Sequence, residues 1–214
     1  MAEHQPIIYS NRILYQIAIR LLYGRHFQDR YRALAGMIPG QSSVVELCCG
    51  DCYLLTHYLG AKQVNYLGLD KSSQFISPAQ KRGINVRQFD VRVDPIPAGD
   101  IIMMQGSLYQ FIPFADQVIR RMLASARQKV LIAEPILNLA TSANPILFAI
   151  RRLIVRFSWG ANSASARRFD RQSLLDLFRS FESFEDYLVI PGGRELIGIF
   201  RKKPAPIMQV NKGY

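Results

Sequence analysis

Residues 44–52 read Val44-Val45-Glu46-Leu47-Cys48-Cys49-Gly50-Asp51-Cys52, a short apolar run that leads through an acid into a turn of small residues. A helix-like segment follows over residues 53–59, and a second apolar run over 64–69 ends at Asp70. Strand, tight turn, helix, strand and acid in this order are typical of a nucleotide-binding βαβ unit. In such a unit the turn lets the backbone approach a ligand, and the acid accepts hydrogen bonds from ribose hydroxyls. We therefore expect a nucleotide site within residues 44–70.

The rest of the chain alternates between strand-like and helix-like segments. This alternation predicts an α/β fold, a doubly wound and mostly parallel sheet with helices on both faces. Two late strand-like segments meet around Pro191-Gly192-Gly193, which predicts a C-terminal antiparallel hairpin. The expected strands are 44–47, 64–69, 86–89, 100–104, 129–133, 187–190 and 196–200, and the expected helices are 53–59, one capped by Ser72 or Ser73 that ends near Arg82, 114–126 and one opened by Asp170.

Helical additions flank and interrupt the predicted sheet domain. Residues 1–40 read as an N-terminal helical cap, with helices over about 10–23 and 26–37. Residues 41–203 form the main domain, with a helical insertion at about 135–170 after the fifth strand. Residues 204–214, which include two prolines, read as a loose tail.

The insertion contains a basic amphipathic segment. Its apolar side chains share one helical face and its arginines the other, which leaves two interpretations open. Either the apolar face packs on the N-terminal helices, or residues 146–171 contact a membrane surface with the arginines among anionic head groups. Both interpretations suit a hydrophobic, lipid-like substrate that enters between the two caps. The apolar residues are Ile146, Leu147, Ile150, Leu153, Ile154 and Phe157, and the arginines are Arg151, Arg152, Arg156, Arg167, Arg168 and Arg171.

Composition limits the partners and the location of the protein. In 214 residues, 27 Lys and Arg against 16 Asp and Glu give a net charge of +11, which favours an anionic partner: nucleic acid, a membrane surface or an acidic substrate. The three cysteines all lie within residues 48–52, too close together for disulfides that would cross-link distant parts of the fold. No signal peptide is evident either, so we expect a cytoplasmic protein. Pro135 and Pro145 interrupt the apolar run over 130–150, so we expect no transmembrane span.

Four segments together carry a family resemblance. Residues 46–52 follow an acid–apolar–turn pattern, Asp70 follows the second strand, Phe89-Asp90-Val91 follows the third, and residues 99–111 contain the fourth strand and a loop. In this order and spacing they resemble the class I S-adenosylmethionine (SAM)-dependent methyltransferases, over roughly residues 44–202. The resemblance implies a seven-stranded Rossmann-like sheet, with SAM as the cofactor and S-adenosylhomocysteine (SAH) as the product.

The resemblance also implies the cofactor residues. In that family the turn after the first strand is Gly-x-Gly-x-Gly, Asp70 matches the ribose-binding acid, and Asp90 matches the acid at the adenine amino group. Here Cys48 and Cys52 replace two of the three glycines. If position 48 has a positive φ, a residue with a Cβ is less stable there by about 1–2 kcal/mol, and cofactor affinity or activity suffers. The implied cofactor residues are Glu46, Cys48, Gly50, Asp70, Lys71, Asp90, Val91 and Gln105.

Purely structural roles for the three acids also stay open. Asp70 could cap the next helix, Asp90 could be a turn acid, and Glu46 could satisfy amides of the turn instead of contacting the cofactor through water.

Residues at the carboxyl ends of the fourth and fifth strands are candidates for substrate contact, because open α/β sheets bind ligands there. These are Tyr109, Gln110 and Glu134, to which we add Tyr31 of the N-terminal cap. No residue is assigned a catalytic role, because the sulfonium of SAM already carries the electrophilic methyl group. The Cys-x-x-Cys at Cys49–Cys52 has its possible zinc ligands on one turn and helix, so we expect no metal site.

The sequence thus predicts SAM-dependent methyl transfer to a small hydrophobic or lipid-related acceptor. Four alternatives stay open. The net charge of +11 favours an RNA methyltransferase. The two cysteines at glycine positions favour a methyltransferase-like protein that binds the cofactor without catalysis, or a non-enzymatic scaffold. A nicotinamide-binding Rossmann enzyme is the last, although it leaves the segments at 89–97 and 107–111 unexplained.

Overall fold

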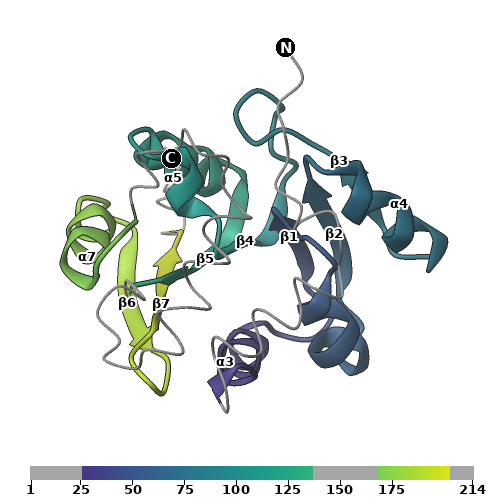
Figure 1. Cartoon of the computed structure of the whole chain (residues 1–214), viewed down its shortest axis with the longest axis horizontal. Coiled ribbons are helices and arrows are strands. Elements are labelled where there is room, and N and C mark those ends of the chain that lie inside the picture. The colour runs from purple at the N-terminus through teal and green to yellow at the C-terminus, as the bar shows by residue number, and fades with distance from the viewer. Residues whose placement is uncertain (1–25, 137–167, 203–214) are drawn as a thin grey trace, which may run out of the picture.

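The computed structural model describes residues 26–136 and 168–202, which form one seven-stranded sheet with helices on both faces (Figure 1). The strand order is β3-β2-β1-β4-β5-β7-β6, and Figure 1 shows the sheet running from β3 beside α4 to β6 beside α7. Strands β1 to β5 are parallel to one another, whereas β7 pairs antiparallel with both β5 and β6. The predicted fold class is therefore confirmed, including the C-terminal hairpin. The strands are β1 (Ser43–Leu47), β2 (Asn65–Asp70), β3 (Val86–Gln88), β4 (Gly99–Gln105), β5 (Ala126–Pro135), β6 (Phe184–Val189) and β7 (Glu195–Arg201).

The two faces of the sheet are covered by different helices. Buried residues of α3 and α4 belong to one core cluster, and those of α5 and α7 belong to the other. Central strands are buried on both faces and so are apolar almost throughout, as parallel strands usually are. Side chains alternate between the clusters along β1, so Val44 faces α3 and Val45 and Leu47 face α5. The helices are α3 (Asp29–Met37), α4 (Ser73–Lys81), α5 (Ala115–Ser125) and α7 (Arg171–Arg179), with short helices η2 (Leu55–Leu59), η3 (Gly60–Lys62) and η4 (Leu108–Phe111).

The expected elements are present with shifted ends. Strand β5 is ten residues long: it pairs with β7 from Lys129 to Pro135, and Ala126 at its start pairs with Gly99 of β4. The segment predicted as a helix over 53–59 contains a π-helical turn, η2. Its Thr56 hydroxyl donates to the carbonyls of Cys52 and Tyr53. Side-chain bonding to preceding carbonyls competes with the regular helical pattern.

Two predicted helix caps differ in outcome. Asp170 caps α7 as expected: its carboxylate accepts the Ser173 backbone N–H at 2.7 Å, and the Ser173 hydroxyl accepts the Asp170 N–H. Ser72 precedes α4 as expected, but its hydroxyl makes no capping hydrogen bond. Its backbone N–H instead donates to Asp70.

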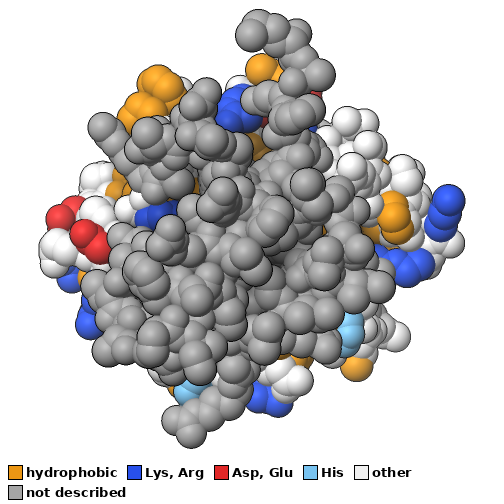
Figure 2. All heavy atoms as spheres, in the orientation of Figure 1, with side chains coloured by type: hydrophobic (Ala, Val, Ile, Leu, Met, Phe, Trp, Pro, Cys, Tyr) orange, Lys and Arg blue, Asp and Glu red, His pale blue; other side chains and the backbone are white. Residues whose placement is uncertain are grey.

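Charged side chains of the described residues lie around the rim of the face seen in Figure 2. Acidic side chains are seen over α7, with lysine and arginine side chains beside them, and further lysine and arginine side chains lie at the opposite edge over α4. Among the described residues, no helix is long and apolar enough to cross a membrane. The helix predicted over 10–23, the amphipathic segment at 146–157 and the tail at 204–214 lie outside the described residues.

Candidate functional site

The turn after β1 has three residues in the left-handed region. Cys48, Gly50 and Cys52 have φ values of 54°, 52° and 58°. These are the three positions at which the resembled family has glycine, so the bend keeps the glycine conformation although two of its residues carry a Cβ. A Cβ placed on Gly50 would meet no atom of residues 26–136 or 168–202 within 4 Å, its chain neighbours aside. Within this part of the chain, the middle of the bend is therefore open to the approach of a ligand.

Backbone strain at Cys48 gives a testable prediction. Glycine adopts a φ of 54° freely, whereas alanine does not, so we expect Cys48→Gly to be more stable than Cys48→Ala by about 1 kcal/mol. Urea unfolding of the two variants measures this difference. Cys49, which is buried and not in the left-handed region, is the matched control, and there the alanine variant should be the more stable. The same order of stability at both positions would contradict the prediction.

Asp70, at the end of β2, holds the bend in place. Its Oδ2 accepts the Gly50 backbone N–H at 2.9 Å, and its Oδ1 accepts the Ser72 N–H at 2.9 Å. Burial raises the pKa of the Asp70 carboxyl, and these two backbone hydrogen bonds act in the opposite direction. Each oxygen keeps a second lone pair for a further donor. Asp70 therefore both orders the bend and has acceptor capacity left beside it.

Glu46, near the end of β1, lies in a buried hydrogen-bond chain. Its Oε2 accepts from the Tyr66 hydroxyl at 2.6 Å, and its Oε1 accepts from Gln105 Nε2 at 2.5 Å. Burial raises the pKa of Glu46 to about 7, although both hydrogen bonds act to lower it. The chain fixes the side chain of Gln105, the last residue of β4.

A second set of cofactor candidates follows β3. Asp90 Oδ1 accepts the Arg92 backbone N–H at 2.9 Å, and its Oδ2 lies 3.2 Å from Lys71 Nζ. Partial burial acts to raise the pKa of Asp90, but these contacts outweigh it and the pKa is lowered. The backbone oxygen of buried Val91 accepts from Arg121 of α5. Asp90 is thus ionised and tied to Lys71, which follows Asp70 directly.

Glu134, near the end of β5, organises the loop after β4. It is buried, and its two oxygens accept the backbone N–H groups of Leu108 and Tyr109 at 2.9 and 3.3 Å. The buried Tyr109 ring lies under Arg168, whose guanidinium carbon is 3.4 Å from the ring centre. Gln110 is exposed. Of the substrate candidates here, Glu134 on β5 therefore fixes the backbone of the loop, Tyr109 is buried in the loop, and only Gln110 is exposed.

The burial of Glu134 makes a prediction about pH. Burial raises its pKa from 4.5 to about 8, against the two backbone hydrogen bonds, so between these values the folded chain holds a proton that the unfolded chain releases. The free energy of unfolding that depends on this group therefore falls as pH rises through the window, at up to about 1.4 kcal/mol per pH unit.

We expect urea unfolding at pH 5, 6.5 and 8 to show this fall as a shrinking stability advantage of the natural chain over Glu134→Gln. Glu46 is present in both chains, so its own titration cancels. An advantage that is constant or grows with pH would contradict the raised pKa.

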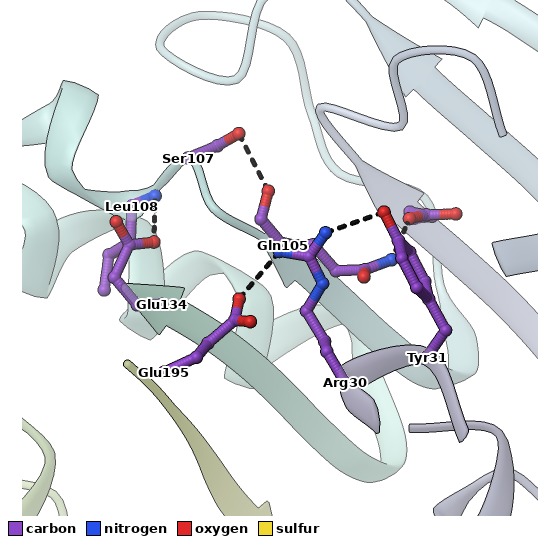
Figure 3. A network of polar contacts seen from close by, with 8 residues as sticks. Arg30, Tyr31, Gln105, Ser107, Leu108, Glu134 and Glu195 are labelled. Atoms are coloured by element: carbon purple, nitrogen blue, oxygen red, sulfur yellow. Dashed lines mark hydrogen bonds and ion pairs between the residues drawn. The ribbon is translucent and has the colours of Figure 1, made fainter. Parts of the chain in front are cut away.

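Arg30 of α3 joins this edge of the sheet, as Figure 3 shows. Its Nη1 donates to Glu195 Oε1 at 2.7 Å, and its Nη2 donates to the Tyr31 hydroxyl at 2.7 Å. Glu195, the first residue of β7, is only 1% exposed. Tyr31, the fourth substrate candidate, packs with the rings of Phe27, Tyr53 and Tyr58.

The buried ion pair is a feature that the sequence did not indicate. Arg30 and Glu195 are 165 residues apart, and each looks like an ordinary surface charge in the sequence. The structure thus gathers all the predicted residues at the carboxyl edge of β1 to β5 or, for Tyr31, on the helix that faces it. Within residues 26–136 and 168–202, no three His, Cys, Asp or Glu side chains are grouped so as to hold a metal ion.

Comparison with known proteins identifies the family. Residues 28–138 match the family model of the methionine biosynthesis protein MetW, and this match spans just over half of the chain. The chain belongs to the MetW family. The matched part of this MetW-family chain contains the bend, Asp70, Asp90, Gln105 and Glu134. No curated protein sequence matches the chain.

Solved methyltransferase structures share the fold. An O-methyltransferase family 2 protein from Planctomyces limnophilus, in complex with apigenin, has a TM-score of 0.61 and 16% identity over 90% of the MetW-family chain, which spans 62% of that protein's length. A Haloferax volcanii methyltransferase in complex with an activator protein has a TM-score of 0.66 and 12% identity, over 94% of this chain and 99% of that one. The magnesium protoporphyrin IX methyltransferase of Synechocystis, with bound SAH, has a TM-score of 0.62 and 13% identity, over 94% and 90%.

These likenesses, together with the MetW match, confirm the resemblance to class I SAM-dependent methyltransferases. They show the architecture and leave the acceptor open.

Proposed function

We propose that the chain transfers the methyl group of SAM to a small hydrophobic acceptor. The observation that carries this proposal is the hydrogen bond between Gly50 N–H and Asp70 Oδ2. It joins an open, left-handed bend after β1 to the acid after β2, which are the two parts of the βαβ unit that bind a nucleoside.

The residues present suit SAM, because acceptors and an open backbone meet at one edge of the sheet. Asp70 has lone pairs for ribose hydroxyls, and Asp90 is an ionised acceptor for the adenine amino group. Bound SAM supplies an electrophilic methyl group, so the protein must position the acceptor and exclude water. We assign the cofactor to the eight residues that the resemblance implied: Glu46, Cys48, Gly50, Asp70, Lys71, Asp90, Val91 and Gln105.

Aromatic groups support a hydrophobic acceptor. Tyr31 lies in a cluster of rings with Phe27, Tyr53 and Tyr58, and Tyr109 is buried in η4, the loop after β4. Two of the similar structures come from a protein in complex with apigenin and from a magnesium protoporphyrin IX methyltransferase, and both compounds are flat and largely apolar. Lipid-like acceptors, and membrane contact through residues 146–171, stay predictions from the sequence.

Two measurements test the proposal. Isothermal titration should show binding of SAM and SAH, and methyl-labelled SAM with a cell extract should yield a labelled product in the organic phase. Binding without any labelled product would identify a cofactor-binding protein without this activity. Absence of binding would overturn the proposal and leave only the architecture.

RNA is a second candidate acceptor, which the net charge of +11 favours. If RNA is the acceptor, label should enter the nucleic-acid fraction, and filter retention of RNA should fall steeply between 50 and 200 mM salt, a range over which phosphate contacts weaken by orders of magnitude. Label in the organic phase together with salt-independent, weak RNA retention would exclude it.

A further inference from the structure

Polar side chains form a row on the α3 face of the sheet, at the carboxyl ends of β1 and β4 and the amino end of the antiparallel β7. Glu46 of β1 is in register with Met103 of β4, so Gln105, two residues later, points to the same face. Gln105 is in register with Ala133 of β5. Pro135, two residues after Ala133 and on the same face of β5, is in register with Glu195 of β7. Glu46, Gln105 and Glu195 therefore line one face, and the small side chain of Ala133 separates the last two.

Arg30 lies against this row from α3. Its Nη1 donates to Glu195 and would be 3.9 Å from a Cβ on Gly106, the residue after Gln105. Figure 3 shows its guanidinium between Gln105 and Glu195, with Tyr31 on the other side. Arg30 and Glu195 therefore form a neutral ion pair in this row, next to Tyr31 of the aromatic cluster.

Two buried acceptors in this row have no partner. Glu195 Oε2 and Gln105 Oε1 make no hydrogen bond to any described residue. Gln105 must present Oε1 as its free atom, because its Nε2 donates to Glu46. Buried polar atoms of native proteins are nearly always paired, so unpaired acceptors on β4 and β7, of which Glu195 Oε2 is charged, indicate a ligand that brings a donor.

The charge balance decides which donor suits the row. An ammonium group would add a positive charge beside Arg30, whose partner Glu195 is already neutralised. It would also lie near the sulfonium of SAM if the proposed function holds. A neutral hydroxyl donates a hydrogen bond without adding charge, and it is also a group that accepts a methyl.

We propose that Glu195 Oε2, the charged acceptor of the two, accepts a hydrogen bond from the hydroxyl group of a neutral, apolar methyl acceptor. This inference rests on the proposed function and adds the class of substrate: a hydroxylated hydrophobic compound such as a phenol. Arg30 is a positioning residue in this site, because it holds Glu195 Oε1 and so turns Oε2 towards the ligand.

Binding of three matched probes to SAH-saturated protein tests the inference. The probes are 4-ethylphenol, its methyl ether 4-ethylanisole, and 4-methylbenzylammonium, and ligand-observed NMR measures their dissociation constants. We expect the phenol to bind about tenfold more tightly than the ether, as one buried hydrogen bond allows, and the ammonium to bind more weakly than the phenol. Equal binding of the phenol and the ether, or tightest binding of the ammonium, would overturn the inference.

Two variants test which of the two oxygens, Glu195 Oε2 or Gln105 Oε1, accepts the hydroxyl. Glu195→Gln can keep its carbonyl towards Arg30 and then presents an NH₂ donor where Oε2 was, so the preference for phenol over ether should fall to about onefold. Gln105→Met removes Oε1 and leaves the Arg30–Glu195 pair intact, so the preference for the phenol should persist in it, and loss of the preference there would place the hydroxyl at Gln105 and overturn the assignment to Glu195. The control is Glu185→Gln, which breaks an exposed ion pair with Arg201 and should change no preference.

A preference for the phenol that persists in both variants would place its hydroxyl elsewhere and refute the inference. Titration of SAH separates this result from failure of the proposed function. If SAH binds every variant and the natural chain shows no preference for phenol, only the acceptor class is wrong. If SAH does not bind the natural chain, the proposed function itself fails.

Discussion

Replacing Asp70 by asparagine should weaken SAH binding by about 100-fold. Under the proposed function, the carboxylate at the end of β2 accepts hydrogen bonds from the two ribose hydroxyls, and bonds to a charged acceptor contribute about 1.5–3 kcal/mol each. Loss of the charge, and of one acceptor oxygen, removes about 3 kcal/mol, which corresponds to this change in affinity. Asp70 also accepts the Gly50 N–H, so an asparagine disturbs the bend as well as the ribose contact. Isothermal titration of SAH measures the effect.

Asp100 provides the matched control for Asp70. It is also a strand acid that accepts a backbone N–H from a neighbouring strand, here that of Ser43 at 2.8 Å. It lies near the start of β4, at the amino edge of the sheet, away from the carboxyl edge where the proposed cofactor residues lie. Asp100→Asn should therefore lower the stability to urea while leaving the affinity for SAH within about twofold. Equal losses of SAH affinity in the two variants would mean that Asp70 acts only through the stability of the fold.

The geometry of the proposed cofactor site could be predicted because its residues are close in the sequence. The bend at residues 48–52 and Asp70 lie on one βαβ unit, so their spacing alone places them together. The sequence also indicated that a cysteine at position 48 is strained if its φ is positive. The structure has a φ of 54° at Cys48, so this condition is met. The π-helical turn at Leu55–Leu59 could not be foreseen, because a π turn and an α turn use the same apolar pattern.

The acceptor side of the site could be predicted only in part, because it depends on contacts between distant segments. Tyr109 and Glu134 follow from the rule that ligands bind at the carboxyl ends of strands, but the two N–H groups held by Glu134 do not. Glu195 begins the last strand after a Gly-Gly turn, and nothing in its neighbourhood indicates that it is buried. Its partner Arg30 is on the first described helix, and only the sheet order β5-β7 brings the two together.

The Arg30–Glu195 pair should be the polar contact whose disruption costs most stability. Arg30→Met leaves the Glu195 carboxylate, 1% exposed, without its cation, and removing one member of a buried ion pair typically costs about 3–5 kcal/mol. The variant should also free the Tyr31 hydroxyl, which accepts from Arg30. Urea unfolding at pH 7 measures the loss, and Arg32→Met, which removes an exposed arginine of the same helix, should change stability by less than about 1 kcal/mol.

The double variant Arg30→Met/Glu195→Met separates the cost of an unpaired charge from the worth of the pair. Two apolar side chains of similar length leave no buried charge, so most of the stability lost in Arg30→Met should return, since buried ion pairs often contribute little more than apolar residues in their place. The same double variant should lose the preference for phenol over its methyl ether, because the acceptor oxygen of Glu195 is gone. Recovered stability with a lost preference would show that the sheet keeps these two charges for binding rather than for folding. A double variant as unstable as Arg30→Met alone would show instead that the pair holds α3 against the sheet.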